Sequence, residues 1–98
     1  MRYGVLALIC LAGPAQALVS PFYDSAEKIM AILESAEVAD ALHQAPIGAI
    51  SNTGTFDGGD DEWTVRVQEC DLILRLTAVA PEGAGKATYR VTVVGPCQ

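Results

Sequence analysis

The chain has 98 residues, of which 51% are hydrophobic and 18% charged, and its formal net charge is −6 at pH 7. This length allows one small domain and leaves no room for a second. The charge argues against a nucleic-acid partner, because binding to phosphates requires a basic face that displaces counterions.

The first 17 residues follow the order of a secretory signal peptide. Arg2 precedes an apolar run over residues 5–12, and a Gly13-Pro14 break and a small-x-small triplet at 15–17 come after it. The run is far shorter than the roughly 20 residues that span a bilayer as a helix. We therefore expect residues 1–17 to be a cleaved signal peptide and residues 18–98 to form one periplasmic or secreted domain without a membrane anchor.

Residues 24–42 carry a helical pattern. Asp24 and Glu27 can form a capping box at its start, and Pro46 limits how far the helix continues. Apolar residues at spacings of three and four make one stripe, which comprises Ile29, Ile32, Leu33, Ala36, Ala39 and Leu42. Val38 lies off this stripe, and Ser35 just before it could act as a second N-cap. Two short helices broken near Ser35 are therefore the alternative to one long helix.

Alternation of apolar and polar residues replaces the helical period after Pro46 and predicts strands. A first strand over residues 47–56 contains Gly48, Asn52 and Gly54, which favour a bulge or an edge position. Further strands are expected over 62–67, from residue 70 onward, and over 87–94, with turns at 57–61 and 81–86.

The apolar positions change phase at Cys70, from odd numbers before it to even numbers after it. A two-residue hairpin turn at Gln68-Glu69 requires this change, because directly opposed residues of an antiparallel pair share a face. A β-bulge would also shift the phase, but the resulting single strand of about sixteen residues would exceed the usual length. We therefore predict a hairpin that pairs Val65 with Leu72.

Two of the three cysteines, Cys70 and Cys97, remain after removal of the signal peptide that contains Cys10. An even count in an exported chain predicts one disulfide. If the two cysteines are cross-strand partners, the same register pairs Leu76 with Val91. The residues that this register leaves unpaired between the two strands are then 81–86, the turn that composition predicts.

Together these elements predict an α+β fold, in which a helix or a helix pair packs on one face of a four-stranded antiparallel meander with one disulfide. The inner face of the sheet is apolar and comprises Trp63, Val65, Val67, Leu72, Leu74, Leu76, Tyr89, Val91 and Val93. The outer face is mainly threonine and arginine.

No catalytic constellation is present in the sequence. Cys70 would need a nearby base to become a nucleophile, and the single histidine, His43, lies at the far end of the predicted helix. Two cysteines and one histidine without close spacing also fall short of a zinc site. We therefore expect a protein that is not an enzyme and carries no cofactor.

Four carboxylates gather in the connection over residues 57–62, namely Asp57, Asp60, Asp61 and Glu62. Ca²⁺ prefers such oxygen ligands, but the spacing does not match an EF-hand loop. We expect a solvated acidic loop, and a metal-binding or small-ligand-binding protein that uses this loop is the alternative function.

The expected function is binding to another exported or cell-envelope protein. One candidate surface is the outer sheet face, where apolar residues lie among arginines, namely Arg66, Ile73, Arg75, Arg90 and Val94. The other is the edge strand over 47–56, which could accept an added strand. The sequence does not define the oligomeric state.

Overall fold

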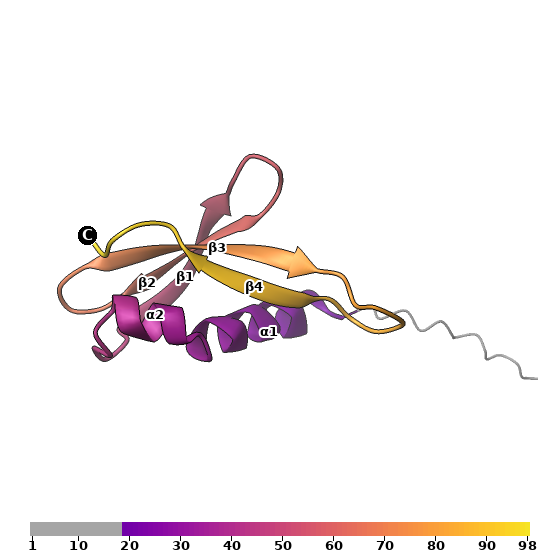
Figure 1. The fold of residues 1–98 in the computed structure, drawn as a ribbon, viewed down its shortest axis with the longest axis horizontal. Helices are drawn as coiled ribbons and strands as arrows, with labels where there is room; N and C mark the ends of the chain where they lie inside the picture. Colours follow the sequence, from indigo (N-terminus) through magenta and orange to yellow (C-terminus); the bar gives the residue numbers. More distant parts are fainter. Residues whose placement is uncertain (1–18) are drawn as a thin grey trace, which may run out of the picture.

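The computed structural model describes residues 19–98, in which two helices lie along one face of a four-stranded antiparallel sheet (Figure 1). The predicted signal peptide lies outside the described residues. In chain order the elements are α1 (Pro21–Leu33), α2 (Ala36–Ala41), β1 (Ala49–Thr55), β2 (Asp61–Arg66), β3 (Asp71–Val79) and β4 (Thr88–Val93). The predicted α+β architecture is thereby confirmed.

Helix α1 begins earlier than the sequence pattern predicts. The hydroxyl of Ser20 caps it by accepting a hydrogen bond from the backbone N–H of Tyr23 at 3.2 Å, and Pro21 occupies the first helical turn. Asp24 therefore lies inside the first turn, so its prediction as the N-cap of a capping box is wrong. The Ser-Pro pair upstream supplies both a cap and a preset backbone angle, which lets the helix start before Asp24.

The helical segment is broken at Ser35, which confirms the two-helix alternative. The Ser35 hydroxyl accepts a hydrogen bond from the backbone N–H of Val38 at 3.2 Å and caps α2. The break gives the second helix a new face, so that Val38 is 3% exposed, while Leu33 at the end of α1 is 52% exposed. The predicted continuous stripe was wrong at Leu33 and Ala36, which are exposed, and it left out Val38, because it assumed an unbroken helical phase.

Strands β2 and β3 form the predicted hairpin. The backbone N–H of Val67 donates to the carbonyl of Cys70 at 3.0 Å, and Val65 pairs with Leu72. Strand β1 lies at one edge of the sheet, and its register shifts between Asn52 and Gly54. Both the predicted edge position and the predicted bulge are therefore confirmed.

Strand β4 pairs with β3 in the predicted register, with Leu76 opposite Val91, and the Cys70–Cys97 disulfide is formed. Beyond β4 the tail leaves this register. The backbone groups of Asp71 and Gln98 exchange two hydrogen bonds of 2.8 and 2.9 Å. This pairing does not continue the β4 register, so the tail contains more residues than the stretch of β3 beside it. Pro96 lies in this segment and has no N–H to donate to a ladder.

The core lies between the helices and the inner face of the sheet. Its buried residues are Ile32, Val38, Leu42, Trp63, Val65, Val67, Leu72, Leu74 and Leu76. The inner residues of β4, including Tyr89 and Val91, are only partly buried. Strand β4 is an edge strand with one neighbour, which leaves part of each side chain uncovered.

Candidate functional site

The acidic loop divides its carboxylates between the two faces of the sheet. Asp60 accepts a hydrogen bond from the hydroxyl of Thr77 at 2.9 Å and lies 3.5 Å from Arg75. Asp61 accepts from Lys28 at 2.7 Å and from the Trp63 indole at 3.3 Å. Thr77 belongs to the outer face and Trp63 to the inner face, so the two carboxylates point in opposite directions.

Protein cations therefore hold Asp60 and Asp61, two of the four carboxylates that the loop was predicted to offer to a metal ion. Asp57 is exposed, and Glu62 is partly buried in β2. Within residues 19–98, no three His, Cys, Asp or Glu side chains are grouped so as to hold a metal ion. The geometry adds no observation in favour of cation binding at this loop.

A polar network joins α1 to the sheet next to this loop. Lys28 lies 3.3 Å from Asp24 and 2.7 Å from Asp61, and its Nζ is 5.3 Å from the centre of the Tyr89 ring. The Tyr89 hydroxyl donates a hydrogen bond to Asp24. Lys28 thus balances two carboxylates that come from different elements.

The pKa values in the network shift in the directions that these contacts require. The hydrogen bond from Tyr89 lowers the pKa of Asp24, with help from Lys28 and against the effect of partial burial. Burial by itself would lower the pKa of Lys28, but the hydrogen bonds to Asp61 and Asp24 outweigh it and raise the pKa. Burial, and then the bond to Asp24, raises the pKa of Tyr89. Each shift favours the protonation state that the network uses, which indicates a structural role.

The outer sheet face brings together part of the predicted interaction surface. Ile73 and Val94 are joined by a backbone hydrogen bond of 3.0 Å and line a hollow of about 350 Å³ together with Phe56 and Pro96. The guanidinium of Arg75 stacks 4.2 Å from the centre of the Phe56 ring. A hollow therefore exists where the sequence placed a contact surface, with Glu62, Asp71 and Gln98 beside its apolar walls and Arg75 stacked on Phe56.

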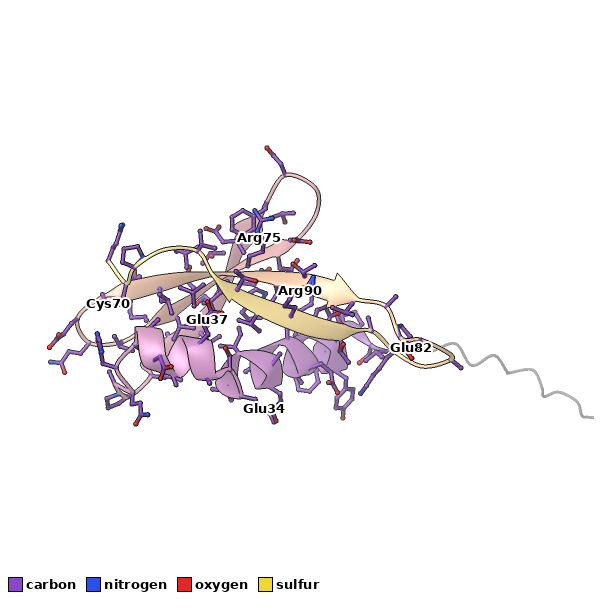
Figure 2. The ribbon with its side chains drawn as sticks, in the orientation of Figure 1. Glu34, Glu37, Cys70, Arg75, Glu82 and Arg90 are labelled. Carbon is purple, nitrogen blue, oxygen red and sulfur yellow. A yellow bond between two sulfur atoms is a disulfide. The ribbon has the colours of Figure 1, made fainter. Side chains whose placement is uncertain are left out.

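The other two arginines of the predicted surface do not join this hollow. Arg66 makes two hydrogen bonds of 2.8 and 3.1 Å to Asp71, which raise the pKa of Arg66 and lower that of Asp71. Arg90 is exposed on β4 opposite Thr77 and makes no ion pair with any residue in the range 19–98. Figure 2 shows Arg75 on the side of the sheet away from the helices.

Exposed apolar side chains also gather on α1. Four side chains at helical spacing project from the helix, and we call them the α1 stripe: Phe22 (73% exposed), Tyr23 (64%), Met30 (50%) and Leu33 (52%). The rings of Phe22 and Tyr23 meet edge to face, with centroids 5.1 Å apart. The sequence pattern did not predict these four residues as one stripe, because Leu33 fell on the apolar stripe expected to face the sheet and the two aromatic residues fell before the predicted helix. A helical projection that starts at Pro21 would have revealed it.

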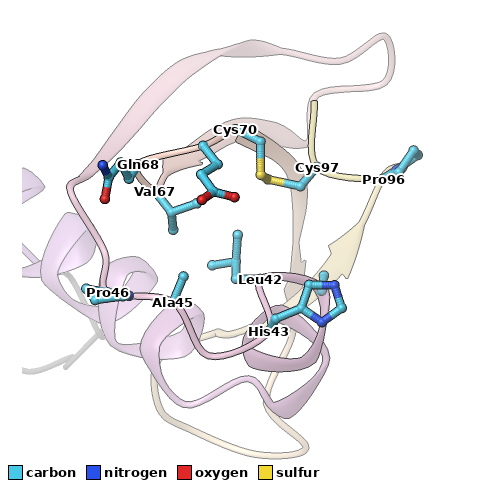
Figure 3. A pocket seen from close by; sticks show the side chains of 11 residues that line it. Leu42, His43, Ala45, Pro46, Val67, Gln68, Cys70, Pro96 and Cys97 are labelled. Atoms are coloured by element: carbon cyan, nitrogen blue, oxygen red, sulfur yellow. A yellow bond between two sulfur atoms is a disulfide. The ribbon is translucent and has the colours of Figure 1, made fainter.

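A pocket with a volume of about 560 Å³ lies at the disulfide end of the molecule (Figure 3). The end of α2, the β2–β3 turn and the C-terminal tail surround it. Leu42, Val67 and the Cys70–Cys97 disulfide provide apolar walls, and His43 and Glu69 are its ionisable lining residues. Because Cys70 is bonded to Cys97, it offers no thiol nucleophile here.

Comparisons of the chain with protein-family models, with curated proteins and with solved structures find no match. Across residues 19–98, no helix is both long and apolar enough to cross a membrane.

Proposed function

We propose that the protein is a small exported, non-enzymatic module that binds another protein, and that the α1 stripe is its main contact surface. The observation that carries the proposal is the exposure of four large side chains on one helix. Exposed apolar side chains that gather on one element often mark a contact surface, and aromatic residues and methionine are enriched where proteins meet. An amphipathic helix with an uncovered apolar face is also a common element of helix-mediated recognition.

The disulfide supports export. Cys70 and Cys97 are bonded, and disulfides persist mainly in oxidising compartments such as the periplasm or the extracellular space. A disulfide is also a frequent means of stabilising a small exported domain.

The charges around the α1 stripe favour a basic partner. Glu27, Glu34 and Glu37 are exposed acids on or next to this helix, and Figure 2 shows Glu34 directed away from the sheet. Glu27 pairs with Lys86 at 2.6 Å, whereas Glu34 and Glu37 make no ion pair within residues 19–98. A second copy of the chain would bring like charges together, so the partner that fits is an amphipathic helix with Lys or Arg beside its apolar face.

The test uses two synthetic helical peptides that share a leucine face, one with lysines and one with glutamates on the polar face. The unmodified protein should bind the lysine peptide. The double variant Met30→Gln/Leu33→Gln, which keeps the net charge and the helix propensity, should bind it roughly tenfold more weakly or worse. Affinities are measured by isothermal calorimetry.

Two control variants locate the contact. Val79→Gln removes another exposed apolar side chain, which lies on β3, and should leave the affinity unchanged. Val94→Gln alters the outer-face hollow. Loss of binding only in Val94→Gln would move the contact to the outer sheet face and contradict the assignment to α1. Equal binding of both peptides would contradict a basic partner.

A further inference from the structure

The pocket at the disulfide, called the disulfide pocket below, has the dimensions of a ligand site. Its volume of about 560 Å³ falls within the range of roughly 300 to 1,000 Å³ in which proteins hold small molecules. It is separate from the α1 stripe, since none of the residues of the stripe lines it.

The walls of the disulfide pocket are apolar and held in place. Figure 3 shows Leu42 and Val67 directed into the space, with the disulfide beside them. Pro46 and Pro96 also line it, and their rings restrict the backbone on two sides. The covalent link between Cys70 and Cys97 ties the tail to the β2–β3 turn. A pocket with fixed walls binds a ligand without the cost of ordering itself first.

The backbone turn that carries the lining residues His43 and Ala45 is unusual. His43 and Gln44 have φ angles of 54° and 59°, a left-handed conformation that residues other than glycine seldom adopt. Backbone hydrogen bonds of 3.1, 2.9 and 3.0 Å from His43, Gln44 and Ala45 to earlier carbonyls hold this turn. Such strained residues concentrate at ligand sites, where the surrounding structure maintains them.

The charge in the pocket selects the kind of ligand. Glu69 lines the pocket and makes no ion pair with any residue of the described range 19–98. No Lys or Arg is among the lining residues, and the whole chain is acidic. An anionic ligand would be repelled, whereas a cation would gain a carboxylate partner beside an apolar wall.

We propose that the disulfide pocket binds a small organic cation with an apolar body, such as an alkylammonium. The apolar body contacts Leu42, Val67 and the disulfide, and the ammonium group lies at Glu69. This site is independent of the protein-binding function proposed for α1.

Three probes with one hydrocarbon body test the proposal: hexylammonium, hexanol and hexanoate. Each is titrated into the purified protein with its disulfide formed, and binding is followed by backbone amide chemical shifts in NMR spectra. Hexylammonium should bind tightest and hexanoate weakest, and the shifts should centre on Leu42, Val67 and Cys70. Three equal affinities, or shifts spread over the whole surface, would overturn the proposal.

Two matched variants separate the local charge from the total charge. Glu69→Gln should weaken the binding of hexylammonium by about three- to tenfold, so that its affinity equals that of hexanol. The affinity for hexanol itself should not change. Glu82→Gln removes the same charge from an exposed acid that does not line the pocket, and should preserve the order of the probes. An equal effect of the two substitutions would show that only the net charge matters and would refute the site.

A third variant tests the apolar walls. Ala45→Leu adds volume at a half-buried lining position and should reduce the affinity for all three probes, while the amide spectrum away from the pocket shows that the fold is retained. Unchanged affinities in this variant would place the probes elsewhere. Met30→Gln/Leu33→Gln should leave hexylammonium binding intact, so a failure of this site and a failure of the α1 surface remain distinguishable.

Discussion

The two ends of the molecule hold the helices against the sheet by different means. At the end near the acidic loop, Lys28 lies between Asp24 and Asp61, and Tyr89 donates to Asp24. At the other end, apolar residues of α2 and the β2–β3 turn meet around the Cys70–Cys97 disulfide. The charged network at the polar end borders hollows of about 190 Å³ each, whereas the covalent link secures the tail beside a larger pocket of about 560 Å³. A small domain can therefore be held together at one end without filling that end completely.

The largest effect should follow from opening the disulfide end. Replacing both cysteines, Cys70→Ser with Cys97→Ser, releases a loop with a sequence separation of 27 and should lower the free energy of unfolding by about 3 to 4 kcal/mol. Urea denaturation monitored by Trp63 fluorescence measures the change. A loss below about 1 kcal/mol would mean that the apolar contacts alone hold this end and that the disulfide is dispensable.

A smaller effect should follow from breaking the polar end at its cation. Lys28→Met keeps much of the side-chain length but leaves Asp24 and Asp61 without their shared partner, which should cost about 2 kcal/mol. The same denaturation experiment applies. Glu27, on the same helix, pairs with Lys86 in an exposed setting, so Lys86→Met serves as the control and should cost less.

The polar end should also depend on pH, and the disulfide should not. The lowered pKa of Asp24 gives a contribution to stability that is present above its ordinary value of 3.8 and is lost as the pH falls through the lower folded-state pKa. The raised pKa values of Lys28 and Tyr89 give contributions that are present below 10.5 and 10.0, respectively, and are lost as the pH rises through the higher folded-state values. Stability should therefore fall in acid below about pH 4 and in alkali above about pH 10.

Tyr89→Phe tests this origin of the pH dependence. It should cost about 1 kcal/mol at neutral pH and should reduce the loss of stability in acid, because the pKa of Asp24 then moves back toward its ordinary value. Denaturation midpoints across the pH range provide the measurement. If the unmodified protein and Tyr89→Phe lose stability at the same acid pH, the loss arises from carboxylates other than Asp24.

The smallest effect is expected at the exposed pair on the outer face. Arg66→Ala removes two hydrogen bonds to Asp71, but solvent and salt screen both side chains. The denaturation midpoint should stay within experimental error of the unmodified protein. A clear loss of stability would show that this pair belongs with the interactions that hold the fold.

The strands were predictable because their constraints are local or covalent. The change of phase at Cys70 follows from the two-residue period of a strand and a tight turn, and a single cysteine pair in the expected domain sets the register of β4. Gly54 marked the irregular edge strand for a similar reason, since glycine weakens a regular ladder. Even here the path of the tail past Pro96 was not foreseen, because the predicted register assumed a continuous ladder.

By itself, the sequence determined the α+β class, the hairpin, the register of β4 and the disulfide, since period, turn length and cysteine count act over short distances or through a bond. Only the tertiary structure decided which apolar residues stay exposed and where space remains. Val38 is buried because the break at Ser35 gives the second helix its own phase against the sheet, whereas Leu33 at the end of α1 stays exposed. Likewise, Glu69 and Leu42 are far apart in the chain and line one pocket only because the disulfide end brings α2, a turn and the tail together.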